Sequence, residues 1–405
     1  MAVDQARLEQ AVAAVPDPDL DLSIGDAGMV AGVRNRRHRA EVVLALPVEG
    51  WPGVDDLRRR VAAAARTVAG VDEATVEIRV MDPPALARLR ARLRRSMEGR
   101  EPGGRSDDHG EPVDRANGHG GGGGDGHAHG QSGHGPGAPT PAFLQPGSPT
   151  RVVGVSSGKG GVGKSSVTVN LAVALARSGK RVGVLDADVY GFSIPKMLGV
   201  DHNPAIVGDL VVPASAHGVR VLSMGFFVSD DQPVIWRGPM LHKAIEQFLG
   251  DAYWGDPDVL LVDMPPGTGD VALSLAQFMS RAEILVVTTP QAAAQRVAQR
   301  SAYAARKLKL SVRGVVENMS WFTADDGTRY ELFGRGGGEA LAGDLGVPLL
   351  GRIPLVPALR EGGDRGLPVA VVDAGGEAAA AFDALAARVL ELGPARVYRR
   401  ELTVG

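Results

Sequence analysis

The sequence predicts an α/β protein in which a parallel sheet, covered by helices on both faces, follows a small α+β domain. From residue 151 onward, short apolar segments alternate with helical segments, which is typical of parallel strands joined by crossover helices. Residues 1–95 instead combine helical periodicity with alternating apolar and polar residues. A glycine-rich stretch separates the two parts, and a length of 405 residues favours two domains over one.

The composition excludes several classes of function. The chain contains no cysteine, which rules out disulfides, thiolate catalysis and cysteine metal ligands. Charged residues make up 22% of the chain and the formal net charge is −3, so no bulk attraction to nucleic acid or to an anionic membrane is expected. No stretch approaches the roughly 20 apolar residues of a membrane span, and the first residues lack the pattern of a secretion signal. We therefore expect a cytoplasmic protein without membrane or nucleic-acid partners.

The first predicted domain, residues 1–95, begins with a helix in "DQARLEQAVAAV". Three apolar residues of this segment fall on one helical face, namely Leu8, Val12 and Val15. The segments "GMVAGVRN" and "RAEVVLAL" alternate as the two strands of a hairpin. After them, "GVDDLRRRVAAAART" has helical periodicity, "DEATVEIRVM" has the alternation of a strand, and "PALARLRARLRRS" predicts a last helix.

Residues 96–148 have the composition of a flexible linker. Residues 103–137 hold 14 glycines and five of the nine histidines, without hydrophobic periodicity. A chain of this length spans roughly 40 Å on average, so we expect the two domains to move independently. Two interpretations of the histidines stay open, a solvated spacer or a weak site for Zn, Ni or Cu formed by His119, His127, His129 and His134.

The second predicted domain, residues 149–395, alternates strands with helices, and residues 396–405 form a short tail. The strand "RVVGVSS" is followed by the helical segment "KSSVTVNLAVALARSG" and by a second strand in "KRVGVLDAD". Further strands are expected in "DVLLVDM", "AEILVVTT" and "VRGVVENM", with helices between them. Because these strands are almost entirely apolar, both faces of the sheet are expected to be buried.

The turn after the first strand of this domain carries the pattern G-x-x-x-x-G-K-[ST] of a phosphate-binding loop, or P-loop. Glycines allow backbone N–H groups to surround phosphates, and the helix N-terminus adds its positive end. Lys164 is expected to reach the β- and γ-phosphates of ATP, and the Ser165 hydroxyl to bind Mg²⁺. The ATP-binding residues expected in this stretch are Gly158, Lys159, Gly160, Gly161, Val162, Gly163, Lys164, Ser165 and Ser166.

Carboxylates at the ends of two later strands complete the predicted site. Asp263 ends the strand in "VLLVDMPPGTGD" and is predicted to bind Mg²⁺ as a Walker B residue, with capping of the next helix as its alternative role. Asp188 in "VLDADVYG" is predicted to orient the attacking water, with a simple turn as the alternative. We expect a switch that senses the γ-phosphate at Asp186, Gly267, Gly269 and Asp270.

Together these motifs resemble the deviant Walker A ATPases, which include MinD, ParA and the nitrogenase iron protein. The matching elements are the loop K-G-G-V-G-K-[ST], the D-x-D pair and D-x-P-P-G-T-G-D. The stretches "DADVYGFSIPKMLG", "DMPPGTGD" and "VVENMSWF" narrow the resemblance to the Mrp/ApbC family of iron–sulfur cluster carriers, over residues 150–372. The resemblance implies a homodimer in which Lys159 contacts the partner subunit's nucleotide, and it implies that Asn318 contacts adenine. The catalytic residues are then Lys159, Lys164 and Asp188.

The first domain resembles the PaaD-like domain of metal–sulfur cluster assembly factors, mainly through "VPDPDLDLSIGDAGMV". Such a domain precedes the ATPase in many Mrp proteins. Two positions depart from the family pattern, and both lack a cysteine. Residues 323–327 are "TADDG" where the family has a Cys-x-x-Cys pair that bridges a cluster between two subunits, and Trp51 stands where PaaD-like domains commonly have a cysteine. Because clusters bind chiefly through thiolates, any cluster on this chain is expected to be held weakly and without thiolate ligands at 323–327.

The sequence therefore predicts a dimeric ATPase, dependent on ATP and Mg²⁺, that works in iron–sulfur cluster assembly or delivery. The resemblance implies an iron–sulfur cluster as cargo, and apo iron–sulfur client proteins or assembly factors as partners. The alternative that stays open is a MinD- or ParA-like positioning switch that recruits a partner. The absence of cysteine excludes an ordinary nitrogenase-type reductase, and no acceptor-binding motif supports a metabolic kinase.

Overall fold

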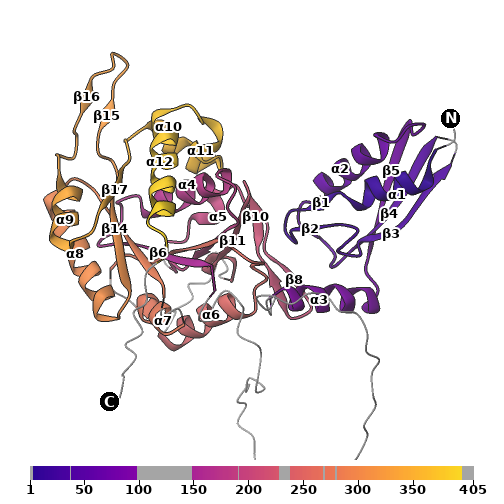
Figure 1. The fold of residues 1–405 in the computed structure, drawn as a ribbon, viewed down its shortest axis with the longest axis horizontal. Coiled ribbons are helices and arrows are strands. Elements are labelled where there is room, and N and C mark those ends of the chain that lie inside the picture. The colour runs from indigo at the N-terminus through magenta and orange to yellow at the C-terminus, as the bar shows by residue number, and fades with distance from the viewer. Residues whose placement is uncertain are drawn as a thin grey trace, which may run out of the picture.

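A computed structural model of the chain describes residues 3–36, 38–97, 148–189, 191–227, 238–267, 270–278 and 281–394. These residues form two groups of elements, which we call the first domain and the second domain (Figure 1). Most of the predicted linker, including its four selected histidines, and the predicted tail lie outside the described residues. Among the described residues, every helix is too short or too polar to cross a membrane.

The first domain packs helices against a three-stranded sheet of order β3-β4-β5. The predicted hairpin is present, since β3 and β4 are antiparallel. The crossover through α2 then makes β5 parallel to β4, an arrangement that local periodicity did not specify. The elements are α1 (Gln5–Ala13), β1 (Pro16–Asp17), β2 (Leu22–Ser23), β3 (Val30–Arg36), β4 (Arg39–Leu46), α2 (Val54–Arg66), β5 (Glu73–Val80) and α3 (Pro83–Met97).

The second domain alternates strands and helices as the sequence predicted, except for consecutive short strands at 205–223 and 322–330 that the sequence analysis did not predict. Its first half contains β6 (Arg151–Ser157), α4 (Lys164–Arg177), β7 (Val182–Asp186), α5 (Ile194–Met197), β8 (Ala205–Val207), β9 (Leu210–Val212), β10 (Ala214–Ala216), β11 (Val219–Ser223), the 3₁₀ helix η2 (Met224–Phe227), α6 (Gly238–Gly250) and β12 (Val259–Asp263). Its second half contains α7 (Asp270–Phe278), β13 (Glu283–Thr288), α8 (Ala292–Lys307), β14 (Ser311–Glu317), β15 (Phe322–Thr323), β16 (Arg329–Tyr330), α9 (Gly337–Leu345), β17 (Leu349–Arg352), α10 (Pro357–Arg365), α11 (Val369–Val372) and α12 (Glu377–Glu391).

Within the described residues, the main sheet has eight strands in the order β10-β11-β7-β12-β6-β13-β14-β17. Seven of them are parallel, as predicted, and the edge strand β10 is antiparallel to β11. The chain passes from β6 to one side of the sheet and later returns to the other side at β13. This reversal of strand order is the place where open α/β sheets bind ligands, at the carboxyl ends of the strands. The ends of β6, β7 and β12 meet there.

Both faces of the main sheet are covered by helices (Figure 1). Helices α6, α7, α8 and α9 pack on one face with the apolar residues of one hydrophobic cluster. Helices α4, α11 and α12 pack on the other face, where a second cluster includes the fully buried Phe382. Every residue of β6, β7, β12 and β13 is buried, which explains why the middle of each strand is apolar, with polar residues mainly at the strand ends.

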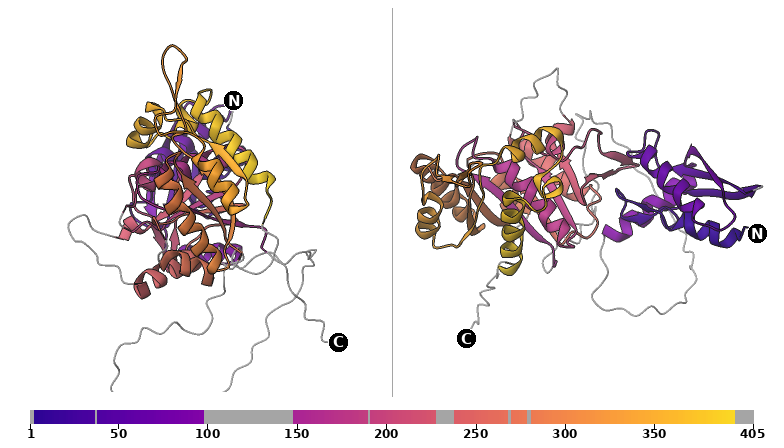
Figure 2. Two further views of the ribbon diagram at one scale, coloured as in Figure 1. Left: turned by 90° about the vertical axis from the view of Figure 1, so that its left-hand side faces the viewer. Right: turned by 90° about the horizontal axis from the view of Figure 1, so that it is seen from above.

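The two domains share a third hydrophobic cluster, in contrast to the expected independent motion. The cluster combines the core of the first domain with residues of the second domain, namely Ala205, Val207, Leu210, Val212 and Tyr253. Four of these five belong to the hairpin β8–β9, which lies beside α3 where the domains meet (Figure 2). Apolar surface buried between domains favours a fixed placement over a free one.

Candidate nucleotide-binding site

The site begins with the glycine-rich loop at 158–163, between β6 and α4. Gly161 and Gly163 have φ values of +80° and +78°, in the left-handed region that favours glycine. A Cβ atom on Gly158 would lie 2.2 Å from the backbone nitrogen of Ala298. The loop therefore requires glycine both for its conformation and for the close approach of α8.

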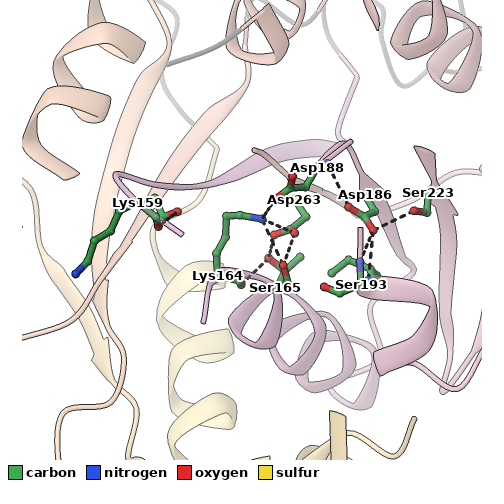
Figure 3. Close-up of polar contacts among 11 residues, drawn as sticks. Lys159, Lys164, Ser165, Asp186, Asp188, Ser193, Ser223 and Asp263 are labelled. Atoms are coloured by element: carbon green, nitrogen blue, oxygen red, sulfur yellow. Dashed lines mark hydrogen bonds and ion pairs between the residues drawn. The ribbon is translucent and has the colours of Figure 1, made fainter. Parts of the chain in front are cut away.

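Lys164 and Ser165 open α4 and turn toward the end of β12 (Figure 3). Lys164 Nζ lies 2.5 Å from Asp263 Oδ2, and Ser165 Oγ donates a hydrogen bond to the same oxygen at 2.7 Å. The side chains of Lys164 and Asp263 are only 6% and 1% exposed, so their ion pair is little screened by water. The predicted lysine, hydroxyl and carboxylate thus meet in one place although 98 residues separate Ser165 from Asp263.

Thr168 is a member of this cluster that the sequence analysis missed. Its Oγ1 donates a hydrogen bond to Asp263 Oδ1 at 2.6 Å and is 3.0 Å from the carbonyl oxygen of Lys164. The residue lies one helical turn after Lys164, beyond the end of the P-loop pattern. The spacing of four residues, which places two side chains on one helical face, is the signal that would have found it.

Asp188 lies just after β7 and faces the same cluster. Its Oδ2 is 3.6 Å from Lys164 Nζ, and the residue is 9% exposed. Together with the glycine-rich loop, Pro265 and Pro266, it lines a cleft of about 730 Å³. Clefts of this size typically hold a cofactor or a drug-sized ligand, so there is room for a nucleoside triphosphate over the loop.

Asp186 is fully buried and points away from the cleft (Figure 3). Its Oδ2 accepts hydrogen bonds from Ser223 Oγ at 3.0 Å and from the backbone N–H groups of Ser193 and Ile194. Its Oδ1 accepts one from the backbone N–H of Asp188 at 3.2 Å. Burial, and next the charge of Asp263, raise the pKa of Asp186 to about 7. The geometry makes Asp186 a group that holds β7, β11 and the start of α5 together.

Lys159 is separated from this cluster. Its side chain extends away from Lys164 (Figure 3), and its Nζ lies 3.4 Å from Gln291 Oε1. The residue is half-buried, and the long distance marks a weak hydrogen bond. The ammonium groups of Lys159 and Lys164 therefore contact different residues.

Asn318 lies on the opposite side of the glycine-rich loop. Its Nδ2 donates a hydrogen bond to the carbonyl oxygen of Val162 at 2.9 Å, and the residue is 4% exposed. A Cβ atom on Gly163 would lie 2.3 Å from this Nδ2. Asn318 also lines a second cleft, of about 390 Å³, with Met319, Leu355 and neighbouring residues.

The predicted switch segment follows Asp263. Gly267 has a φ of +92°, and its N–H donates to the carbonyl oxygen of Ser157 at 2.8 Å. Ser301 Oγ donates to the carbonyl oxygen of Gly267 at 3.1 Å. Asp270 begins α7, and Gly269 lies outside the described residues.

At or beside the two positions where the resemblance implies cysteines, residue 51 and residues 323–327, the structure has a tryptophan whose indole N–H donates a hydrogen bond. Trp51 is 1% exposed, and its Nε1 donates to Asp17 Oδ2 at 3.0 Å. Around 323–327, Glu377 accepts hydrogen bonds from three groups, Trp321 Nε1, Thr323 Oγ1 and Arg329 NH2, at 2.9, 2.9 and 2.6 Å. In the parts of the chain that the structure describes, no three histidine or acidic residues come together as a metal site. Because the chain also has no cysteine, these residues do not fit an iron–sulfur cluster.

Two family models match separate parts of the chain, and neither match includes α3. Residues 148–390 match the model of the NUBPL iron-transfer P-loop NTPases, and residues 5–78 match that of an iron–sulfur cluster assembly protein. Proteins named iron–sulfur cluster carrier protein are 43% identical in Mycobacterium tuberculosis and 42% in Mycobacterium leprae, over 90% of this chain and 87% of each relative. A nucleotide-binding protein from Archaeoglobus fulgidus, solved with ADP, is 36% identical with a TM-score of 0.48, over 54% of this chain and 87% of that one.

Proposed function

The chain belongs to the family of NUBPL iron-transfer P-loop NTPases, with iron–sulfur cluster carrier proteins as relatives, and from this premise we propose that it hydrolyses ATP as a Mg²⁺-dependent homodimer in cluster assembly or delivery. The observation that supports hydrolysis best is the meeting of Lys164, Ser165, Asp188 and Asp263 beside one cleft. A lysine, a hydroxyl and two carboxylates at a P-loop are the groups that phosphoryl transfer needs. A cytoplasmic location stays a prediction.

ATP binding rests on the loop and on the first turn of α4. The backbone N–H groups of 158–163 and the positive end of α4 attract phosphate oxygens, and Lys164 adds a full charge beside them. Ser165 Oγ and Asp263 Oδ2, 2.7 Å apart, are the hard oxygen donors that Mg²⁺ prefers. When bound, Mg²⁺ neutralises negative charge on the β- and γ-phosphates.

Hydrolysis needs a group that orients water and accepts its proton, and Asp188 suits this role. Its carboxylate lines the cleft and lies 3.6 Å from Lys164 Nζ, so a water between Asp188 and a bound γ-phosphate would lie beside the attacked phosphorus. Asp186 is placed to act through Asp188, since it accepts the backbone N–H of that residue. We therefore assign Asp186 a positioning role, with Asp188 as the catalytic carboxylate.

The homodimer is proposed because the Lys159 ammonium lies apart from Lys164 and Asp263, although Lys159 belongs to the lining of the cleft. Its Nζ contacts Gln291, and its side chain extends away from Lys164 (Figure 3). In a dimer whose two glycine-rich loops face each other, the Lys159 ammonium of one subunit would reach the phosphates of the nucleotide bound to the other subunit. There it would act as an arginine finger does, by neutralising charge that develops during transfer.

The iron–sulfur cluster enters this proposal as cargo, and this chain contributes no thiolate to it. Trp321, Thr323 and Arg329 are bound to Glu377 at the position of the family's cysteine pair. We therefore propose that the chain acts on clusters through contacts with client proteins or assembly factors. A positioning switch of the MinD or ParA kind has less support, because the curated relatives are cluster carriers.

The decisive experiment has two parts. Phosphate release from ATP is measured for the full chain with and without Mg²⁺, and for Lys164→Ala. We expect release to require both Mg²⁺ and Lys164. If the wild type shows no Mg²⁺-dependent release, the proposed ATPase activity is wrong. Activation of an apo iron–sulfur enzyme by iron and sulfide is then followed with and without the chain. Acceleration that requires ATP supports delivery, and an unchanged rate contradicts it.

A further inference from the structure

The segment Asp17–Asp21 of the first domain forms a corner, hereafter the acidic corner, that one carboxylate holds in shape. Asp17 is 2% exposed. Its Oδ1 accepts the backbone N–H groups of Asp19 at 3.1 Å and Leu20 at 3.0 Å, while Oδ2 accepts Trp51 Nε1. Asp17 is therefore used within the first domain, and the two other carboxylates of the corner are left to face outward.

Those two carboxylates meet a pair of residues in the second domain. Ser215 Oγ donates to Asp19 Oδ1 at 2.7 Å, and Arg220 NH2 lies 4.0 Å from Asp21 Oδ2. Ser215 and Arg220 are direct partners across β10 and β11. Asp21 has a φ of +55°, a conformation that is unusual for a residue with a side chain. The acidic corner is thus shaped to fit this strand pair.

A second contact lies at the hairpin β8–β9. Its apolar residues join the core of the first domain, and Asp209 in its turn forms ion pairs with Arg90, at 2.8 Å, and with Arg94, both on α3. These three charged side chains are each between 39% and 49% exposed. The Arg90 side chain packs closely on this turn, since a Cβ atom on Gly208 would lie 2.9 Å from Arg90 Cδ.

Strand β11 connects the acidic corner to the nucleotide cleft. Arg220 and Ser223 are three residues apart on this strand, a distance of roughly 10 Å at the usual rise of a strand. Ser223 Oγ donates to Asp186 Oδ2 at 3.0 Å, and that oxygen also accepts the N–H of Ser193. Ser193 lines the cleft together with Asp188. One short strand therefore contacts the first domain at one end and positions the wall of the cleft at the other.

We propose that the first domain is a regulator docked on the second domain through the acidic corner and the β8–β9 hairpin, and that β11 links docking to nucleotide affinity. The inference rests on the proposed function in one respect, that the cleft binds ATP. A docked first domain holds β11, and through it the contacts of Asp186 that shape the cleft. Undocking loosens them and weakens ATP binding. Because coupling between two sites is reciprocal, bound nucleotide in turn stabilises docking.

The test separates docking from the nucleotide site by changing Asp209, which lies outside the cleft. Asp209→Arg places three cations together and should undock α3 from the hairpin. The triple variant with Asp209→Arg, Arg90→Asp and Arg94→Asp restores opposite charges and is the matched control. Docking is read by energy transfer between dyes on cysteines introduced at Arg7 and Arg335, which are 80% and 83% exposed; the chain has no other cysteine.

Affinity for a non-hydrolysable ATP analogue with Mg²⁺ is measured by calorimetry on the same proteins. We expect Asp209→Arg to lower energy transfer and to weaken binding about fivefold or more, the lower end of typical coupling, and the triple variant to restore both. Undocking with unchanged affinity overturns the linkage, and unchanged energy transfer overturns the docking surface. Thermal unfolding checks that the variant is folded, and Ser215→Ala provides a second, milder undocking variant. A wild type that binds no analogue contradicts the proposed function instead, while energy transfer still tests docking.

Discussion

Replacing Lys159 by alanine should separate the catalytic role of this residue from any structural one. In the isolated subunit the ammonium has one hydrogen bond within the described residues, at 3.4 Å to Gln291 Oε1. A half-buried contact of this length contributes at most about 1 kcal/mol to stability. If the lysine reaches the partner subunit's phosphates, its loss should lower kcat about 10³–10⁵-fold, as loss of an arginine finger does. That loss corresponds to about 4–7 kcal/mol of transition-state stabilisation.

The assay is phosphate release as a function of protein concentration, with thermal unfolding in parallel. Lys159→Ala should unfold within a few degrees of the wild type, bind ATP, and lose both hydrolysis and ATP-dependent dimerisation. Lys307→Ala, which removes an exposed lysine at the end of α8, serves as the control and should retain activity.

A mixing experiment tests the trans position directly. In a mixed dimer with Asp188→Asn, one site combines an intact Asp188 with an intact Lys159 from the other subunit. At protein concentrations high enough to pair all subunits at random, equal mixing should therefore restore about a quarter of the wild-type activity, since half of the dimers are then mixed and each has one intact site. If Lys159→Ala hydrolyses ATP normally as a dilute monomer, the trans role and the proposed dimer are both wrong.

Three further predictions concern other parts of the chain. Asp188→Asn should keep nucleotide affinity and lower kcat about 10²–10⁴-fold, because an amide is a poor proton acceptor; normal turnover would remove Asp188 from the mechanism. Anaerobic reconstitution with iron and sulfide should leave no stoichiometric four-iron cluster on a chain without cysteine, and absorption spectroscopy with iron counting would expose a stable cluster as a contradiction. Burial raises the pKa of Asp19 above 3.8, partly offset by the hydrogen bond from Ser215. The folded chain thus keeps this proton to higher pH than the unfolded chain, so the free energy of unfolding falls as pH rises from about 3.8 toward the folded pKa. Asp19→Asn, which still accepts from Ser215, should flatten this fall in urea titrations at a series of pH values, and an identical pH dependence in both proteins would refute the assignment.

The sequence predicts the alternation of apolar strands and helices and the loop at 158–163. Both features depend on residues that are close together in the chain. The P-loop pattern is one continuous segment of strand, loop and helix. It therefore predicts that Lys164 and Ser165 lie at the start of α4, even when the order of strands in the sheet is not known. Asp263 was also foreseeable, since a carboxylate at the end of a buried strand lies at the ligand-binding edge of a parallel sheet. The sequence by itself therefore specified the fold class and most of the residues that come together at the candidate nucleotide-binding site.

Only the tertiary structure shows which residues far apart in the sequence come into contact. Thr168 enters the site only because α4 faces β12, and Asp186 is a buried residue that accepts a hydrogen bond from Ser223 on β11 and does not line the cleft. The docking of the first domain rests on contacts such as that between Asp19 and Ser215, 196 residues apart. Local periodicity carries no information about such pairs, because their free energy arises from the burial of surfaces that meet only after both domains have folded.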